Sequence, residues 1–300
     1  MRLTLLDDAR PAPRSLAIGT FDGVHIGHRE VIRSARTVVT FEPHPATVVA
    51  PEHAPPLLTP LAVKADLIAA LGVEELVVVR FDAAFAALDA RRFVDEVLVE
   101  RLDAREVSVG ENFRFGARAL GDAALLAADG RFAAHVVPLR EEGGEIVSSS
   151  RIRSLVALGD VALAARLLGD PFEMRGTVVG GDRRGRELGF PTANLDPVPG
   201  LCHPGHGVYA ALANGVPAAV SIGVRPTFGS GRAELIEAHL IDWTGDLYGR
   251  ELSLRFLERL RGERRFESVE ELIAVMNDDI ARARAICASA TVPGPDAPDE

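Results

Sequence analysis

The chain has 300 residues, of which 47% are hydrophobic and 5% aromatic, and its formal net charge is −10 at pH 7. An acidic chain lacks the basic footprint that phosphate neutralisation requires, so we expect no nucleic-acid partner. No apolar run approaches the ~20 residues of a membrane span, and the N-terminus lacks a signal-peptide core, so we expect no membrane partner and a cytoplasmic location.

The first half alternates apolar runs with helical patterns. Thr59-Pro60 predicts a helix over 60–71, with Thr59 as its cap, and Asp89 precedes a predicted helix over 90–101. This alternation predicts a doubly wound parallel sheet with helices on both faces and ligands at the carboxyl ends of its strands. Five valine-rich runs provide the strands: 15–19, 37–41, 75–81, 106–110 and 133–139.

A change in the predicted secondary-structure pattern divides the chain. A predicted helix over 150–158, continued to Leu168, ends the first half, and Gly169-Asp170-Pro171 breaks the pattern. Short alternating strands and glycine turns follow without intervening helices, and Asn214-Gly215 is a strong hairpin signal, so we expect a small antiparallel β-barrel.

The end of the chain completes the expected domain organisation. A terminal helix begins after Ser268, with Glu271 completing a capping box, and runs to about Cys287. We therefore predict one domain over 1–168, a second over 169–288 and a disordered tail over 289–300.

The most distinctive stretch of the first half is GTFDGVHIGH, residues 19–28, directly after the first predicted strand. A strand-to-helix turn exposes backbone N–H groups that favour an anion, and His25 and His28 add donors on the same side. A zinc site is the alternative, with Asp22, Glu42 and His44 as further ligands, but no second ligand pair has suitable spacing. The fold context favours phosphate.

Two further stretches support a phosphate site. TFEPHP (40–45) ends the second predicted strand, and VSSSRIR (147–153) opens a helix with hydroxyls and two arginines, which suits a polyphosphate better than a plain cap. Lys64 is the only lysine, and the chain has no G-x-x-x-x-G-K-[ST] loop, so we expect phosphate binding to rest on backbone amides, histidines, arginines and metal.

The second half contains GTVVGGDRRGRELGFPTANL, residues 176–195. Glycines 180, 181, 185 and 189 allow a loop whose amides wrap phosphates, although a solvated glycine-rich hairpin is the simpler alternative. Pro191 leads into Thr192 and Asn194, whose oxygens suit Mg²⁺.

A carboxylate on a following strand could serve as a general base. ELIEAHLID (234–242) offers Glu234, Glu237 and Asp242, and His239 is either a partner of Glu237 or a structural histidine. A zinc site at Cys202, His203 and His206 lacks a fourth ligand and is weakly supported.

Together these motifs resemble the prokaryotic bifunctional riboflavin kinase/FAD synthetase family. The resemblance rests on G-x-F-D-G-V-H-x-G-H, T-F-E-P-H-P, G-x-N-F-R-F-G (110–116), S-S-S-R-I-R, G-F-P-T-A-N and E-A-H-L-I-D. It implies a nucleotidylyltransferase-type first domain and a kinase barrel that together convert riboflavin to FMN and FMN to FAD, with ATP and Mg²⁺. Ser150 stands where threonine is more usual, and the short interval after His28 implies a truncated first helix.

The resemblance also implies roles for individual residues. His25, His28 and Glu237 would be catalytic, Glu237 as the base of the kinase, and Thr192 and Asn194 would hold Mg²⁺. In the first domain, Gly19, Phe21, Asp22, Gly23, Asn112, Ser148, Ser149 and Arg153 would bind ATP, and Phe41, Pro43 and His44 the flavin. In the kinase, Gly180, Gly185, Gly189, Pro191, Thr192 and Asn194 would bind ATP. A single-activity enzyme and a non-catalytic flavin-binding protein are the rival hypotheses, and a homo-oligomer is an open option.

Overall fold

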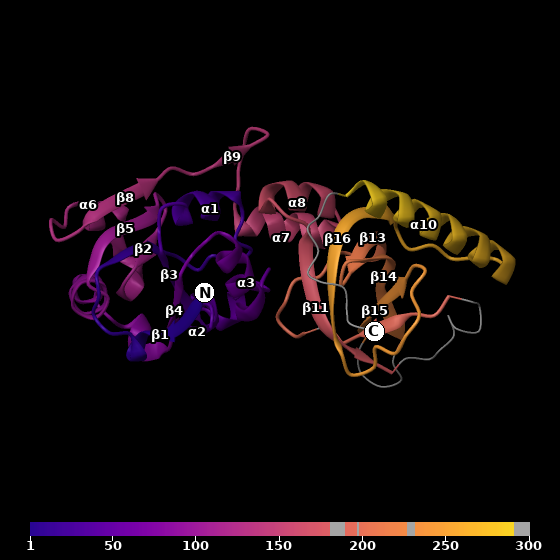
Figure 1. Cartoon of the computed structure of the whole chain (residues 1–300), viewed down its shortest axis with the longest axis horizontal. Coiled ribbons are helices and arrows are strands. Elements are labelled where there is room, and N and C mark those ends of the chain that lie inside the picture. Colours follow the sequence, from indigo (N-terminus) through magenta and orange to yellow (C-terminus); the bar gives the residue numbers. More distant parts are fainter. Residues whose placement is uncertain (181–189, 197, 227–231, 291–300) are drawn as a thin grey trace. The chain divides into compact units, whose positions relative to one another are not determined.

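A computed structural model of the chain describes residues 1–180, 190–196, 198–226 and 232–290 (Figure 1). The chain divides into two compact units, Met1–Ser149 and Ser150–Glu300. No helix in these described ranges combines the length and the apolar character needed to cross a bilayer.

The first unit is built on a six-stranded sheet in which every neighbouring pair is parallel. All five predicted strands belong to it, which confirms the parallel architecture. The edge strand β1, Arg2–Leu5, was not predicted and pairs with β4. In spatial order the strands are β1, β4 (Glu75–Arg80), β3 (Thr37–Glu42), β2 (Arg14–Ile18), β5 (Ala104–Gly110) and β8 (Ala133–Val137).

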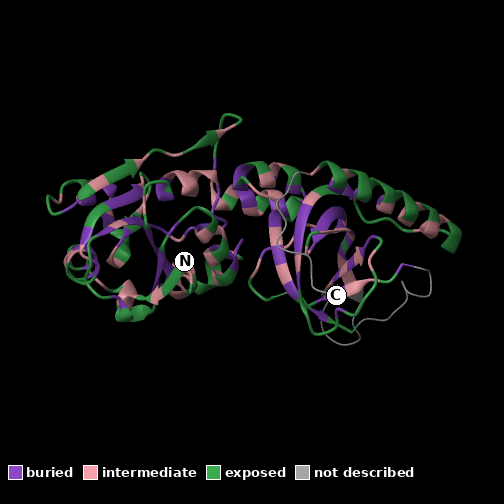
Figure 2. Cartoon of the chain, in the orientation of Figure 1, coloured by how far each residue is buried: buried purple, intermediate pink, exposed green. Residues whose placement is uncertain are grey.

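Both faces of this sheet are buried, as its valine-rich strands require. Alternate strand residues enter two separate apolar clusters: Ile18 and Val39 face one, Ala17 and Val38 the other. Figure 2 shows buried residues along the strands of this sheet. The helices are α1 (Ile26–Ile32), α2 (Pro45–Val49), α3 (Leu61–Ala70), α4 (Ala83–Ala86), α5 (Ala90–Arg92) and α6 (Ala123–Ala127), with the short 3₁₀ segments Leu6–Asp8, Pro51–His53 and Ala117–Ala119. Two small hairpins, β6 (Arg114–Phe115) with β7 (Gly121–Asp122) and β9 (Glu141–Glu142) with β10 (Glu145–Ile146), complete the unit.

Two helix predictions fared differently. The Asp89 carboxylate accepts a hydrogen bond from the Arg91 N–H and caps α5, which continues as a π-helix over Phe93–Arg101, so the helix predicted over 90–101 is confirmed. The Thr59 cap is wrong: α3 begins after Pro60 without a side-chain cap. The Thr59 hydroxyl instead accepts a hydrogen bond from the Gly23 N–H at 3.0 Å.

The second unit begins with α7 (Ser149–Leu158) and α8 (Val161–Leu168) and contains a closed antiparallel barrel, as predicted. Asn214 and Gly215 form the predicted hairpin turn, both with positive φ (46° and 84°). In spatial order the barrel strands are β11 (Phe172–Val179), β12 (Ala193–Leu195), β15 (Arg232–Leu240), β14 (Val216–Pro226), β13 (Gly207–Ala213) and β16 (Glu251–Arg261).

Helix α8 and most of α7 belong to the second unit and pack with the barrel. Helix α8 contacts β11 and β16, and the Gly205 N–H donates to the Val156 carbonyl at 3.0 Å. The compact unit therefore begins at Ser150, ahead of the break that the sequence shows at 169–171. The boundary between the two catalytic domains, placed at residue 168 from the sequence, stays a prediction.

The terminal helix α10, Val269–Ser289, covers one side of the barrel. The Ser268 hydroxyl accepts from the Glu271 N–H at its start, as predicted, and the buried Asp279 carboxylate pairs with Arg261 of β16. Residues 291–300 of the predicted tail lie outside the described residues.

Candidate active sites

The chain leaves β2 through a turn with an unusual backbone. Phe21, Gly23 and Val24 have φ values of 49°, 85° and 41°, and positive φ is strongly disfavoured for a β-branched residue such as Val24. At Gly19 a Cβ atom would lie 3.0 Å from the Phe21 ring, so glycine avoids a tight contact there. Strain of this kind concentrates at functional sites, and this turn lies at the carboxyl end of a central parallel strand.

His25 and His28 are brought together at the start of α1. Their rings stack with centroids 3.5 Å apart, and the His25 Nδ1 accepts a hydrogen bond from the His28 N–H at 3.2 Å. Because its Nδ1 is an acceptor, a neutral His25 carries its proton on Nε2. The His28 Nδ1 is buried and has no hydrogen-bond partner among the described residues.

Both histidines are neutral at physiological pH. Burial lowers the pKa of His25 to about 4, although a backbone hydrogen bond and the charge of Asp22 oppose this shift. Burial, followed by the charges of His25 and Lys64, lowers the pKa of His28 well below its ordinary value. The pair can therefore donate N–H groups to an anion but does not contribute positive charge.

The Asp22 carboxylate organises the loop beside this turn. It accepts hydrogen bonds from the N–H groups of Leu58 and Thr59 at 2.9 and 3.0 Å, and from the Thr59 hydroxyl at 3.4 Å. Asp22 is buried, so it supports the turn from within rather than facing a ligand.

Ser149 also joins the turn, because its hydroxyl donates to the Asp22 carbonyl at 2.8 Å. Ser148 precedes it in the first unit, and Arg153 lies one helical turn later, in the second unit, with its Nη1 atom 3.5 Å from the Ser150 hydroxyl. Of the proposed ATP ligands, the structure thus brings Gly19, Phe21, Asp22, Gly23 and Ser149 together at one turn. Asn112 lies exposed in the turn after β5.

The proposed flavin residues lie at the carboxyl end of β3. Phe41 is buried and packs edge-to-face on Phe81, within a group of phenylalanines that links the ends of neighbouring strands. Pro43 follows a cis peptide bond, and the His44 Nδ1 accepts a hydrogen bond from the Ala46 N–H, which caps α2. Phe41 therefore has a core role, and His44 has a capping role.

Sequence reasoning missed Lys64, which lies on α3. Its side chain is buried, with the residue only 4% exposed, and its ammonium lies 3.5 Å from the Thr40 hydroxyl of β3. Burial lowers its pKa, while the charges of Asp22 and Glu42 act in the opposite direction. A lone lysine outside a phosphate-loop motif gives no sequence signal of this placement.

In the barrel, β12 and β15 bring the proposed metal ligand and the proposed base together. Asn194 and Glu237 are directly opposite cross-strand partners, so their side chains project to the same face. Thr192 lies directly before β12, two residues ahead of Asn194. Asn194 is 8% exposed, and its Oδ1 has no hydrogen-bond partner among the described residues.

A buried, unpaired amide oxygen fits a Mg²⁺ site, because it is a hard oxygen donor whose burial is costly without a partner. No group of three or more His, Cys, Asp or Glu side chains suited to a metal ion occurs in the described ranges. The other suggested metal residues are occupied otherwise: the His203 Nδ1 lies 3.2 Å from the Pro204 carbonyl oxygen, and the His206 Nδ1 lies 3.7 Å from a Glu263 carboxylate oxygen.

The neighbours of Glu237 are also engaged. Asp242 pairs with Arg284 of α10 at 2.8 Å, and the His239 Nδ1 lies 2.8 Å from the Pro191 carbonyl oxygen. The contact with the Pro191 carbonyl favours a structural role for His239. The Glu234 side chain and Gly185 and Gly189 lie outside the described part of the structure, whereas Gly180 follows β11 in an exposed position.

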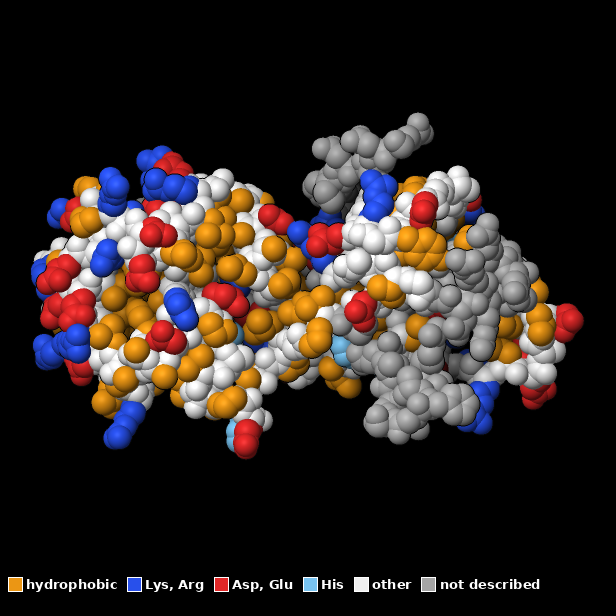
Figure 3. Space-filling view, turned by 90° about the horizontal axis from the view of Figure 1, so that it is seen from below, with side chains coloured by type: hydrophobic (Ala, Val, Ile, Leu, Met, Phe, Trp, Pro, Cys, Tyr) orange, Lys and Arg blue, Asp and Glu red, His pale blue; other side chains and the backbone are white. Residues whose placement is uncertain are grey.

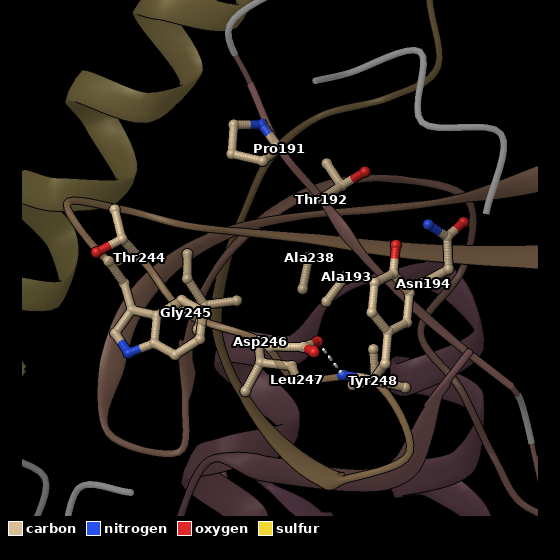
Figure 4. Close-up of a pocket in the computed structure, with 13 residues that line it drawn as sticks. Pro191, Thr192, Ala193, Asn194, Ala238, Thr244, Gly245, Asp246, Leu247 and Tyr248 are labelled. Carbon is tan, nitrogen blue, oxygen red and sulfur yellow. Dashed lines mark hydrogen bonds between the residues drawn. The ribbon is translucent and has the colours of Figure 1, made fainter. Parts of the chain in front are cut away.

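A pocket of about 320 Å³ is lined in part by Thr192 and Asn194, the proposed metal ligands. Ala193 and Ala238 line it from adjacent strands, and the Asp246 carboxylate accepts from the Tyr248 N–H (Figure 4). Trp243 and Leu247 add apolar surface.

The first unit has a strand-to-helix turn with histidine N–H donors at the carboxyl end of a parallel strand. The barrel carries a buried amide oxygen opposite a carboxylate. Both features suit enzymes that transfer phosphoryl or nucleotidyl groups. Residues 7–151 match the family model of FAD synthetase, and residues 168–287 match that of riboflavin kinase.

Individual relatives agree with the family models. The chain is 40% identical over 287 residues to the bifunctional riboflavin kinase/FMN adenylyltransferase of Escherichia coli (strain K12), covering 90% of this chain and 91% of that protein. It is 38% identical to the enzyme of the same name from Pseudomonas fluorescens, covering 94% and 96%. A solved structure described as a macrolide-efflux protein from Streptococcus pneumoniae has a TM-score of 0.86 and 29% identity, covering 95% and 99%. The chain belongs to the family of bifunctional riboflavin kinase/FMN adenylyltransferases.

Proposed function

We propose that this enzyme makes FAD at two separate sites and uses ATP at both. The barrel phosphorylates the 5′-hydroxyl of riboflavin to give FMN, and the sheet unit adenylylates FMN to FAD with release of pyrophosphate. The match of a different catalytic family model to each half supports this division.

In the adenylyltransferase, a phosphate oxygen of FMN attacks the α-phosphorus of ATP. The nucleophile is already an anion, so the site needs charge neutralisation and alignment but no general base. We assign phosphate binding to the backbone N–H groups of the turn after β2, the N–H donors of His25 and His28, and Arg153. Ser148, Ser149 and Asn112 complete the ATP contacts, and segment 41–45 holds the flavin.

In the kinase, the riboflavin hydroxyl must lose a proton as it attacks the γ-phosphorus. We assign Glu237 as the acceptor of that proton. Thr192 and Asn194 hold Mg²⁺, which would neutralise charge on the ATP phosphates. The observation that carries this assignment concerns the Asn194 Oδ1 directly opposite Glu237: it is buried and has no hydrogen-bond partner among the residues that the structure describes.

Glu237→Gln tests the assignment on one purified protein. Glutamine keeps the size of the side chain but cannot take up the proton, so we expect FMN formation from riboflavin to fall about 10²–10⁴-fold. FAD formation from added FMN should stay within a few-fold of wild type. Asp242→Asn is the matched control, because that carboxylate pairs with Arg284 and should not affect either rate beyond a few-fold.

The products of wild type discriminate the rival functions. Incubation with riboflavin, ATP and Mg²⁺ should give FMN and then FAD, resolved by chromatography. FMN without FAD would indicate a single-activity enzyme, and no turnover would indicate a flavin-binding protein. Undiminished kinase activity in Glu237→Gln would exclude Glu237 as the base.

A further inference from the structure

The only lysine of the chain is buried directly behind the proposed phosphate-binding turn. Its ammonium lies 3.5 Å from the Thr40 hydroxyl, and that hydroxyl donates to the Thr20 carbonyl at 3.1 Å, inside the turn that follows β2. This contact is the one hydrogen bond of the ammonium within the described residues, where it forms no ion pair.

A buried ammonium is costly unless an opposite charge compensates for it. The nearby carboxylate of Asp22 is already occupied, because it accepts hydrogen bonds from the Leu58 and Thr59 N–H groups. Glu42 is the other carboxylate that acts on Lys64, at the end of β3. The ammonium therefore retains donor capacity toward the carboxyl ends of the strands, where a bound anion would complete its environment.

The neighbouring histidines make a cation at this position useful. Both are neutral, so they can donate hydrogen bonds to a phosphate without balancing its charge. Pyrophosphate and the β- and γ-phosphates of ATP carry several negative charges. Arg29 of α1 is the nearest cation on the helix, but its Nε donates to the Val24 carbonyl at 3.2 Å.

We propose that Lys64 is a positioning residue of the adenylyltransferase, whose fixed positive charge behind the turn after β2 holds the pyrophosphate group of ATP. The inference rests on the assignment of that turn as the phosphate site. When the FMN oxygen bonds to the α-phosphorus, the bond from that phosphorus to the bridging oxygen breaks, and pyrophosphate leaves with the electron pair. Lys64 neither gives nor takes a proton in this step.

The reverse reaction isolates this site, because only the adenylyltransferase combines FAD with pyrophosphate to give FMN and ATP. Lys64→Met keeps the length of the side chain and removes its charge, so we expect the KM for pyrophosphate to rise about 10- to 100-fold. The KM for FAD and the riboflavin kinase rate should change less than about three-fold. A purely structural role would lower the melting temperature and leave the KM for pyrophosphate unchanged.

Thr40→Val is the matched control. It removes the hydroxyl that contacts the ammonium and keeps the charge, so the KM for pyrophosphate should stay within about three-fold of wild type. An equal rise in both variants would show that the hydroxyl contact, and not the charge, holds the site together, and would overturn the proposal.

Wild-type protein provides a test that does not depend on a variant folding. Because Lys64 is the only lysine, labelling with ¹⁵N-lysine gives a single side-chain signal in NMR spectra. Saturation with inorganic pyrophosphate should shift this signal as an ammonium, and adenosine, which lacks phosphates, should not. An unmoved signal, or a neutral amine in the complex, would refute the role of Lys64.

His28→Ala separates this inference from the functional assignment. If His28→Ala raises the KM for pyrophosphate and Lys64→Met does not, the phosphate site stands and the role of Lys64 fails. If neither variant changes it, the turn after β2 is not the pyrophosphate site, and both assignments fail.

Discussion

His25 should make the first unit sensitive to mild acid. Its pKa is lowered to about 4 in the folded protein, mainly by burial, against an ordinary value of 6.5. Between these values the unfolded chain binds a proton that the folded chain excludes, so stability rises with pH across this window. The contribution is fully present above pH 6.5 and is lost as pH falls toward 4.

The two pKa values set the size of the effect. Between about pH 7.5 and pH 5, the shift of His25 corresponds to a loss of about 2 kcal/mol in the free energy of unfolding. His28, whose pKa is lowered as well, acts in the same direction. The total loss in wild type should therefore exceed the contribution of His25 alone.

His25→Asn isolates this contribution, because asparagine can still accept the hydrogen bond from the His28 N–H at the helix start. Urea unfolding of the full chain, followed by circular dichroism at both pH values, should show a smaller acid loss in the variant, by about 2 kcal/mol. The exposed His53 provides the control His53→Asn, which should behave as wild type. If His25→Asn and wild type lose equal stability, the argument from burial is refuted.

Three further predictions concern single side chains. His28→Ala should reduce FAD formation from FMN and leave FMN formation from riboflavin nearly intact, because we assign His28 to phosphate binding. Added zinc should not restore the activity, and stoichiometric zinc in wild type that is lost on mutation would revive the metal alternative. Asn194→Leu should leave the melting temperature without ligand within a few degrees of wild type, since it removes a buried acceptor that has no partner in the described part of the chain. It should abolish the stabilisation of the kinase unit by Mg²⁺ and ATP, and retained stabilisation would contradict the metal assignment. Glu75→Gln should lower the free energy of unfolding by about 3 kcal/mol in urea, because it breaks the buried ion pair with Arg14. The control Glu74→Gln, in an exposed ion pair with Arg36, should lower it by less than about 1 kcal/mol, and equal losses would show that burial of the first pair is unimportant.

The strands that could be predicted from the sequence are those that carry their own signal. Valine-rich runs such as 37–41 and 75–81 are buried on both faces, and Asn214-Gly215 adopts the positive φ values that these residue types favour. Strand β1 was missed because Arg2–Leu5 is exposed along most of its length, and its position depends on pairing with β4, more than seventy residues later.

The parts of the site that could not be predicted depend on contacts between distant segments. Thr59 has the residue type of a helix cap, but its hydroxyl is used by Gly23, on the other side of the site. Lys64 lies outside any phosphate-loop motif, so the sequence carries no signal of its burial close to the carboxylates of Asp22 and Glu42. The pairing of Asn194 with Glu237 likewise follows from the barrel register, which residue spacing alone does not reveal.

Trp243 is the only tryptophan of the chain, and it lines the pocket beside β12 in the second unit. Its indole emission therefore reports on the barrel alone, since the first unit contributes none. Figure 3 shows apolar and charged side chains intermingled on one face of each unit. A flavin bound near the indole would absorb its emission, so occupancy of the kinase can be followed in the intact enzyme while the adenylyltransferase remains optically silent at that wavelength.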